Sequence, residues 1–176
     1  MALTKINNNT LSAITGLPAG VGGKVLQVVS ITKTDSFSFS SSSYTDITGL
    51  TASITPSSAS NKILILSHLV TGSISSGSIG ARLARGGTGI SINTESGSFT
   101  KGSFGGIDHG NSPPDATSSG SIVFLDSPAT TSSTTYSIQV ISPSSETNYI
   151  NRPTADASSI YEQRGTSSIT LIEIAG

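Results

Sequence analysis

The stretch that decides the fold is KILILSHLV, residues 62–70, which is apolar at almost every position and is bounded by polar residues. It is far too short to cross a bilayer as a helix, and a short apolar run between turn residues is typical of a strand. Successive side chains of a strand point to opposite faces, so both faces of this strand are apolar. One face carries Ile63, Ile65 and Leu69, and the other carries Leu64, Leu66, His68 and Val70.

The final stretch, GTSSITLIEIAG at residues 165–176, repeats this pattern. Ile169 and Leu171 fall on one face, and Ile172 and Ile174 fall on the other. A two-layer sandwich buries only one face of each sheet, and a large exposed apolar patch usually marks an interface. We therefore expect the second face to be covered by other copies of the chain. The predicted subunit-interface residues are Leu64, Leu66, His68, Ile172, Glu173 and Ile174.

Glu173 is the one acid inside the final apolar run. An unpaired charge removed from water costs several kcal/mol, so a buried Glu173 needs a basic partner, within the chain or across a contact. The alternative is a solvent-facing strand edge, where charges discourage aggregation. The interface hypothesis predicts that Glu173→Ala weakens assembly more than it weakens the isolated fold. The candidate partners are Arg82, Arg85, Arg152 and Arg164.

The rest of the chain from Lys24 onward alternates short apolar runs with Ser, Gly and Pro, and it offers no convincing helix of ten or more residues. This spacing predicts an all-β protein, an antiparallel sandwich for which a jelly roll is the favoured closed form. The predicted strands span 24–31, 36–39, 44–55, 62–70, 78–85, 121–126, 135–142, 147–151, 159–164 and 167–175.

The bulk composition excludes several classes of protein. The chain has 176 residues, enough for one domain with a real core, and its 34% apolar content argues against disorder. Without Cys it can form neither disulfides nor thiolate metal sites. With 11% charged residues and a net charge of -1, it lacks the basic surface of a nucleic-acid or membrane binder. The N-terminus lacks the order of a signal peptide.

Residues 1–23 differ from the rest and are predicted to form an extended or partly helical arm that ends in a Gly/Pro hinge. Consecutive Asn residues and the later Gly and Pro residues argue against a long helix. Sparse apolar side chains without partners of their own suit an arm that lies on another protein; the alternative is a frayed terminus. Residues 24–176 are then the sandwich domain. The predicted anchoring residues are Leu3, Ile6, Leu11, Ile14 and Leu17.

The segment from Gly86 to Gly120 is long, Gly-rich and low in apolar residues. Loops of this length inside a compact domain are often functional, so it is the candidate partner-facing loop. The alternative is an exposed insertion with one weak strand, because surface insertions are well tolerated. The candidate contact residues are Phe99, Phe104, Asp108 and His109.

The sequence carries little that indicates catalysis. His68 lies in the most apolar strand, where a structural or interface imidazole is the simpler interpretation. His109, with Asp108 and Asp115, is the only local group that could hold a cation or act as a base, and such pairs arise readily by chance in loops. No nucleophile elbow, P-loop or dinucleotide motif occurs. We therefore predict no enzyme activity, no catalytic or metal-ligating residue and no cofactor.

Five segments together carry a family resemblance: GLPAGVGGKVLQVV at 16–29, SNKILI at 60–65, YSIQV at 136–140, NYINRP at 148–153 and the terminal GTSSITLIEIAG. The chain resembles small virion structural proteins of tailed bacteriophages, of the marine and cyanobacterial type, which are tail-fibre-like or capsid-decorating. The resemblance implies a homotrimer of jelly-roll-like domains on the virion surface, assembled in the host cytoplasm and anchored by the N-terminal arm. Capsid or tail proteins are the implied partners.

The favoured hypothesis is a non-enzymatic capsid-decorating or cement protein, because the chain has neither a coiled-coil heptad run nor a collagen-like repeat to form a shaft. The first alternative is a tail fibre or receptor-binding appendage that contacts a host glycan or protein through residues 86–120. The second is a carbohydrate-active enzyme on the same scaffold, with Asp108, His109 and Asp115 as its candidate residues.

Overall fold

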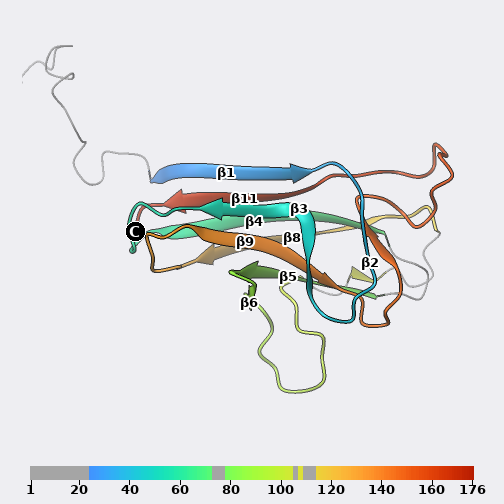
Figure 1. The fold of residues 1–176 in the computed structure, drawn as a ribbon, viewed down its shortest axis with the longest axis horizontal. Coiled ribbons are helices and arrows are strands. Elements are labelled where there is room, and N and C mark those ends of the chain that lie inside the picture. Colours follow the sequence, from blue (N-terminus) through green and yellow to red (C-terminus); the bar gives the residue numbers. More distant parts are fainter. Residues whose placement is uncertain (1–23, 73–77, 105–106, 109–113) are drawn as a thin grey trace, which may run out of the picture.

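The computed structural model describes residues 24–72, 78–104, 107–108 and 114–176. Within these residues the protein is built from antiparallel strands and contains no helix. The strands form two sheets that share one core, in a sandwich-like arrangement (Figure 1). The prediction of an all-β antiparallel fold is thus confirmed.

The first sheet has four long strands in the order β1-β11-β4-β8, so β11, close to residue 176, lies between β1 and β4. Two short strands extend this sheet beyond the N-terminal end of β11. There β10 pairs with the last residues of β4, and β2 pairs with β10. The strands are β1 (Val25–Lys33), β2 (Phe37–Phe39), β4 (Lys62–Gly72), β8 (Ser118–Asp126), β10 (Asn148–Ile150) and β11 (Ser167–Ile174).

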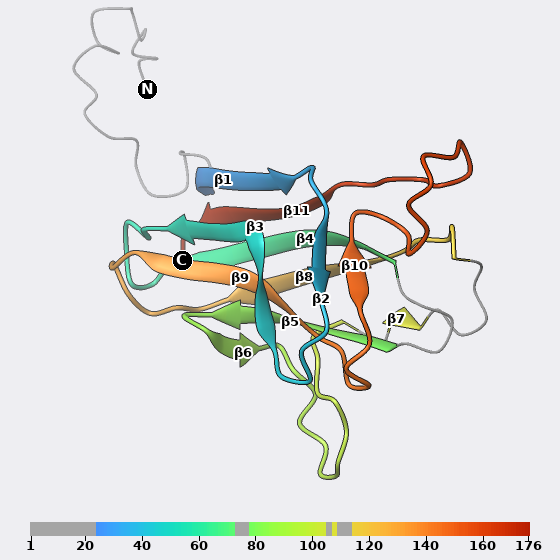
Figure 2. The ribbon, with the colours of Figure 1, turned by 45° about the vertical axis from the view of Figure 1, so that its right-hand side comes forward.

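The second sheet has the order β3-β9-β5-β6, and the two-residue strand β7 pairs with the start of β5. Every long strand is followed along the chain by a long strand of the other sheet, so the connections cross repeatedly between the layers (Figure 2). The strands are β3 (Thr45–Ile54), β5 (Ser78–Arg85), β6 (Thr88–Ile90), β7 (Ile107–Asp108) and β9 (Thr134–Ile141).

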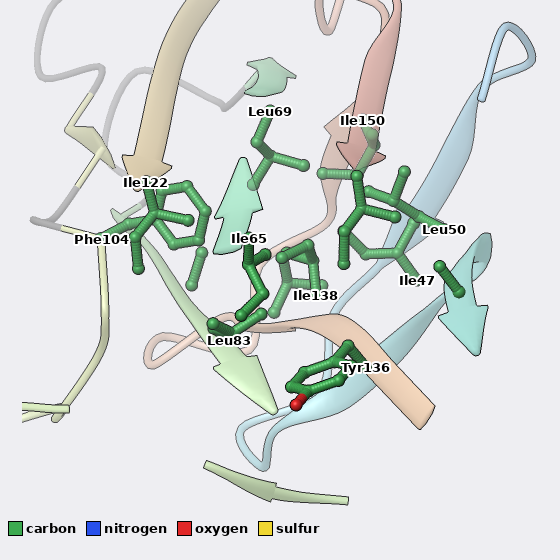
Figure 3. Packing of buried hydrophobic residues seen from close by; sticks show 14 of the residues in the cluster. Ile47, Leu50, Ile65, Leu69, Leu83, Phe104, Ile122, Tyr136, Ile138 and Ile150 are labelled. Carbon is green, nitrogen blue, oxygen red and sulfur yellow. The ribbon is translucent and has the colours of Figure 1, made fainter. Parts of the chain in front are cut away.

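The core lies between the inner faces of the two sheets, as the alternation in the sequence predicts (Figure 3). Ile63, Ile65 and Leu69 are all fully buried, whereas Leu66 and His68 on the same strand are exposed. The second sheet contributes a matching set of inward side chains. The largest fully buried residues are Tyr136, Ile47, Leu50, Ile54, Ile63, Ile65, Leu69, Ile79, Leu83, Ile138, Ile150 and Ile169.

One predicted strand is wrong: residues 159–164 form a loop with a turn at 160–161. The local hydrogen bonds explain the difference. The Glu162 carboxylate accepts bonds from the backbone N–H groups of Ala157 (2.8 Å) and Ser159 (3.4 Å), which folds the segment back on itself. Ser158, directly before the predicted strand, has a positive φ of 59°, so the backbone is not extended where that strand would begin.

The 86–120 segment contains more regular structure than predicted. Gly86 and Gly87, both with positive φ, form a tight turn into β6, which runs back along β5. β7 adds a short pairing at Ser78 and Ile79, and β8 begins before the predicted start of its strand. The irregular part of this segment that the structure describes is therefore mainly residues 91–104.

Gly72 marks a close approach of two backbones. A Cβ at this position would lie 2.1 Å from the Arg152 carbonyl oxygen and 2.7 Å from the Pro153 Cα. We expect Gly72→Ala to lower the free energy of unfolding by about 2–3 kcal/mol in chemical denaturation, because backbone cannot move aside as a side chain can. Gly89→Ala is the control, since its Cβ would meet only the movable Arg82 side chain; equal losses in both variants would contradict the expectation.

Candidate functional site

The register of the first sheet lines up apolar side chains across its outer face. In one row, Val28 pairs with Ile172, which pairs with Leu64, which pairs with Leu125. Val28 and Leu125, at the two edge strands, are 57% and 47% exposed. An apolar row that spans a whole sheet on its outer side is not expected of a face that remains in water.

Neighbouring rows extend this surface. Leu66 pairs with Val123, which is 70% exposed, and Ile174 pairs with Val25, which is 56% exposed. The surface defined here as the outer apolar patch comprises Val25, Val28, Leu64, Leu66, Val123, Leu125, Ile172 and Ile174. Its side chains come from all four long strands of the sheet.

The patch ends at a polar row. His68 lies beside Ser168 and Ser121 and its Nδ1 is 3.2 Å from the Ser121 hydroxyl. Val70, the next residue after His68 on this face of β4, is buried and lies against Gly165 of the segment that precedes β11. Of the predicted interface residues, Leu64, Leu66, His68, Ile172 and Ile174 share this one face, as the alternation indicates.

The outer face of the second sheet has the opposite chemistry. Arg82 Nε donates to Gln139 Oε1 at 2.7 Å, and the Ser137 hydroxyl donates to Asp46 at 2.6 Å. The Arg82 guanidinium also lies over the Tyr44 ring, 4.1 Å from its centre. Polar side chains satisfy one another on this side, so the two outer faces of the molecule are chemically unequal.

Glu173 lies on the inner side of β11, between the outward-facing Ile172 and Ile174, and it is buried. The predicted ion pair with an arginine is not formed; neutral donors of the same chain bind the carboxylate instead. Oε1 accepts bonds from the Ser57 N–H (2.7 Å), the Ser57 hydroxyl (2.8 Å) and Asn61 Nδ2 (2.6 Å), and Oε2 accepts one from Gln27 Nε2 (2.6 Å). The solvent-facing alternative is also wrong, because the turn at 57–61 covers the carboxylate.

These hydrogen bonds set the acidity of Glu173. Burial alone raises the pKa of a carboxyl, but the bonds donated by Asn61, Gln27 and Ser57 outweigh it and lower the pKa of Glu173 to about 2. The carboxylate therefore stays ionised at neutral pH without a cation beside it. Its position ties β11 to β1 and to the turn before β4, which is a structural role within one chain.

The arginines that were candidate partners of Glu173 have other partners. Arg85 Nη1 contacts both carboxylate oxygens of Asp126, at 2.9 and 2.8 Å, and the Tyr136 hydroxyl donates to the same carboxylate at 2.6 Å. Burial and the bond to Asp126 raise the pKa of Tyr136 above its ordinary value. This group links β5, β8 and β9 at one end of the sandwich.

A second arginine group holds the segment before β11. Arg152 stacks on the Tyr149 ring at 3.6 Å and lies 3.5 Å from Asp156, which also pairs with Arg164. This segment carries Ile160 and Tyr161, two of the most exposed large side chains among the described residues.

The partner-facing loop is only partly as predicted. Phe99 is exposed, but Phe104 belongs to the core (Figure 3), where it is buried with Ile122 and Ile79. Phe104 therefore holds the loop in place. The backbone of Asp108 forms β7, and His109 lies outside the described residues, as do the predicted anchoring residues Leu3, Ile6, Leu11, Ile14 and Leu17.

Within the residues that the structure describes, no group of three or more His, Asp or Glu side chains is placed to hold a metal ion. The same residues include no helix that is both long and apolar enough to cross a membrane. Compared with protein-family models and with curated proteins, the chain gives no match. The outer apolar patch is accordingly the candidate functional site on geometry alone.

Sequence reasoning missed half of this patch. Val25, Val28, Val123 and Leu125 lie in predicted strands but were not assigned to the interface. The signal was present in SIVFLD, residues 121–126, where alternation places Val123 and Leu125 opposite Ile122 and Phe124. What was lacking was the strand order, which brings these residues beside Leu64 and Leu66.

Proposed function

We propose that the protein is a non-enzymatic structural component of a bacteriophage virion, a trimeric knob that decorates the capsid surface. In this proposal each knob buries its outer apolar patch against other copies and is attached to the particle through residues 1–23. The observation that carries the proposal is the row from Val28 to Leu125, which leaves one sheet face apolar on the outside as well as on the inside.

The chemistry of the patch favours a second copy of the same chain as its cover. None of the eight residues that define the patch is charged; the exposed Lys62, which pairs with Ile174, is a charged residue at its margin. Two such faces can therefore meet over their apolar rows without burying like charges when Lys62 stays at the rim of the contact. Burial of apolar area at about 25 cal/mol per Å² would stabilise the contact.

The jelly-roll form and the trimer are both implied by the resemblance to phage virion structural proteins. The strand order supports the jelly-roll form. A jelly roll places two four-stranded antiparallel sheets face to face and winds the chain between them. The order β1-β11-β4-β8 in one sheet and β3-β9-β5-β6 in the other fits this winding, because successive long strands alternate between the two sheets and only the short β6 returns along β5 as a hairpin in the second sheet.

The test of assembly and attachment uses the full chain. Sedimentation at micromolar concentration should give a species of three times the mass of one chain. A chain lacking residues 1–23 should remain folded and assembled but should no longer join particles. A stable monomer would overturn the trimer, and unchanged incorporation of the shortened chain would overturn the anchoring role. Labelling the protein on imaged particles distinguishes head from tail.

The receptor-binding alternative is favoured by a separate observation. Phe99 is 65% exposed at the edge of a cavity formed by the 91–104 loop, away from the outer apolar patch. A tail location together with host-surface binding through this loop would favour that function over capsid decoration.

A further inference from the structure

The 91–104 loop is fixed at its base. The backbone N–H groups of Ser103 and Phe104 both donate to the Ala81 carbonyl, at 3.1 and 3.2 Å. The Tyr44 hydroxyl donates to the Lys101 carbonyl at 2.8 Å, and the Ser103 hydroxyl bridges the Leu83 N–H and the Ile90 carbonyl. The loop therefore has a defined conformation without a ligand, which reduces the entropy lost on binding.

Residues of the loop line a cavity that is open to solvent. Its volume of about 430 Å³ is within the usual range for small-molecule sites. Phe99 lies at its edge, and its ring packs so closely on Gly97 that a Cβ there would be 2.5 Å from Phe99 Cε2. Gly97 also has a φ of 136°, which side-chain-bearing residues rarely adopt. The backbone thus supports the ring at a position where most of its surface faces solvent.

Polar groups surround this ring. Asn93 Oδ1 accepts the Glu95 N–H at 2.7 Å, which fixes the start of the cavity wall. Among the residues that the structure describes, the Glu95 carboxylate and the Lys101 ammonium have no side-chain or backbone partner, and both line the cavity. In a chain with 11% charged and 5% aromatic residues, one cavity thus combines an exposed aromatic ring with both signs of charge.

We propose that this cavity binds a pyranose ring of a surface glycan. A pyranose has an apolar C–H face, which can stack on Phe99, and an edge of hydroxyl groups. Those hydroxyls can donate to the Glu95 carboxylate and accept from Lys101 and the Asn93 amide. The opposite charges of Glu95 and Lys101 favour a neutral ligand over an anionic one, and an apolar ligand would leave both charges without partners.

The place of the loop in the fold supports this assignment, which rests on the receptor-binding alternative. In both ribbon views the yellow-green loop after β6 hangs on the side away from β1 (Figures 1 and 2). β1 is an edge strand that contributes Val25 and Val28 to the outer apolar patch. The cavity is lined by residues 93, 95 and 99–104, none of which belongs to the patch, so a contact through the patch uses other side chains than the proposed sugar site.

The test measures the binding of defined sugars to the full chain by saturation-transfer NMR and by calorimetry. The probes are the methyl pyranosides of glucose, galactose, mannose and N-acetylglucosamine, and short oligosaccharides of each on a surface. We expect weak, millimolar binding of at least one monosaccharide and tighter binding of its multivalent form. Phe99→Ala should weaken binding at least tenfold, and Glu95→Gln should weaken it several-fold.

Tyr161→Ala is the matched control, because it removes an equally exposed aromatic ring far along the chain and should leave sugar binding unchanged. Thermal unfolding of each variant excludes loss of fold as the cause. Failure of every probe to bind, or equal binding by Phe99→Ala and the unmodified chain, would overturn the proposal. Either result would leave trimer formation and capsid attachment unaffected, since those are measured by sedimentation and particle incorporation.

Discussion

Replacing Leu66 and Val123 together by aspartate is expected to convert the assembled protein into folded monomers. The two residues are a cross-strand pair in the outer apolar patch, and Val123 is 70% exposed in the single chain. The carboxylates are therefore hydrated in the monomer but lose water in an assembled contact. At about 2 kcal/mol for each buried, unpaired group, the double variant should weaken association about a thousandfold.

Sedimentation equilibrium measures this change, and circular dichroism establishes that the fold is kept. Thr51→Asp is the matched control, since it adds a carboxylate to an exposed strand position on the second sheet, beside Ser137. The control should assemble as the unmodified chain does. Continued assembly of the Leu66→Asp, Val123→Asp chain would mean that the patch is not the contact between copies.

The second large effect is expected at Glu173. Glu173→Ala should lower the free energy of unfolding by about 2 kcal/mol, because the Ser57 N–H loses its acceptor and the side-chain amides of Gln27 and Asn61 keep only their bonds to the Thr55 carbonyl and the Ser57 hydroxyl. This replaces the expectation that the variant chiefly weakens assembly. Chemical denaturation of the monomeric Leu66→Asp, Val123→Asp background separates the two effects. A loss of assembly with unchanged monomer stability would restore the interface role.

The same carboxylate makes stability depend on pH. Its folded pKa of about 2 lies below the ordinary value of 4.5, so the folded state favours the ionised form. The resulting stabilisation is fully present above about pH 4.5 and is lost as the pH falls towards 2. Glu173→Gln should remove this part of the acid dependence in denaturation curves measured from pH 7 to pH 2. An unchanged pH profile in that variant would contradict the assignment.

The fold was predictable because period two persists through most of the chain. Alternation in residues 62–70 and 167–175 places each side chain on the correct face, and most predicted strand ends lie within a few residues of the observed ones. The failure at 159–164 has a physical cause, since SIYEQR has strand-like composition but its Glu162 binds nearby backbone N–H groups. Local composition cannot reveal which acceptor a backbone group will find.

The candidate site was predictable only in part, because a surface depends on strand order. Leu64 and Ile172 could be assigned to an outer face from their own strands, but their neighbours Val28 and Leu125 come from the two edges of the sheet. Glu173 was placed at an interface because its strand neighbours are apolar. Its true surroundings come from residues 27, 57 and 61, over a hundred positions away in the chain.

The place of β11 in the first sheet has a consequence for how the chain folds. This strand is synthesised after all the other strands of its sheet, yet it pairs with β1 on one side and β4 on the other. KILILSHLV therefore lacks one of its two neighbours until residues 167–174 have been made. Pairing between such distant segments slows folding, so refolding should take milliseconds to seconds rather than microseconds. A ribosome that pauses before residue 167 would hold a nascent chain whose first sheet cannot close.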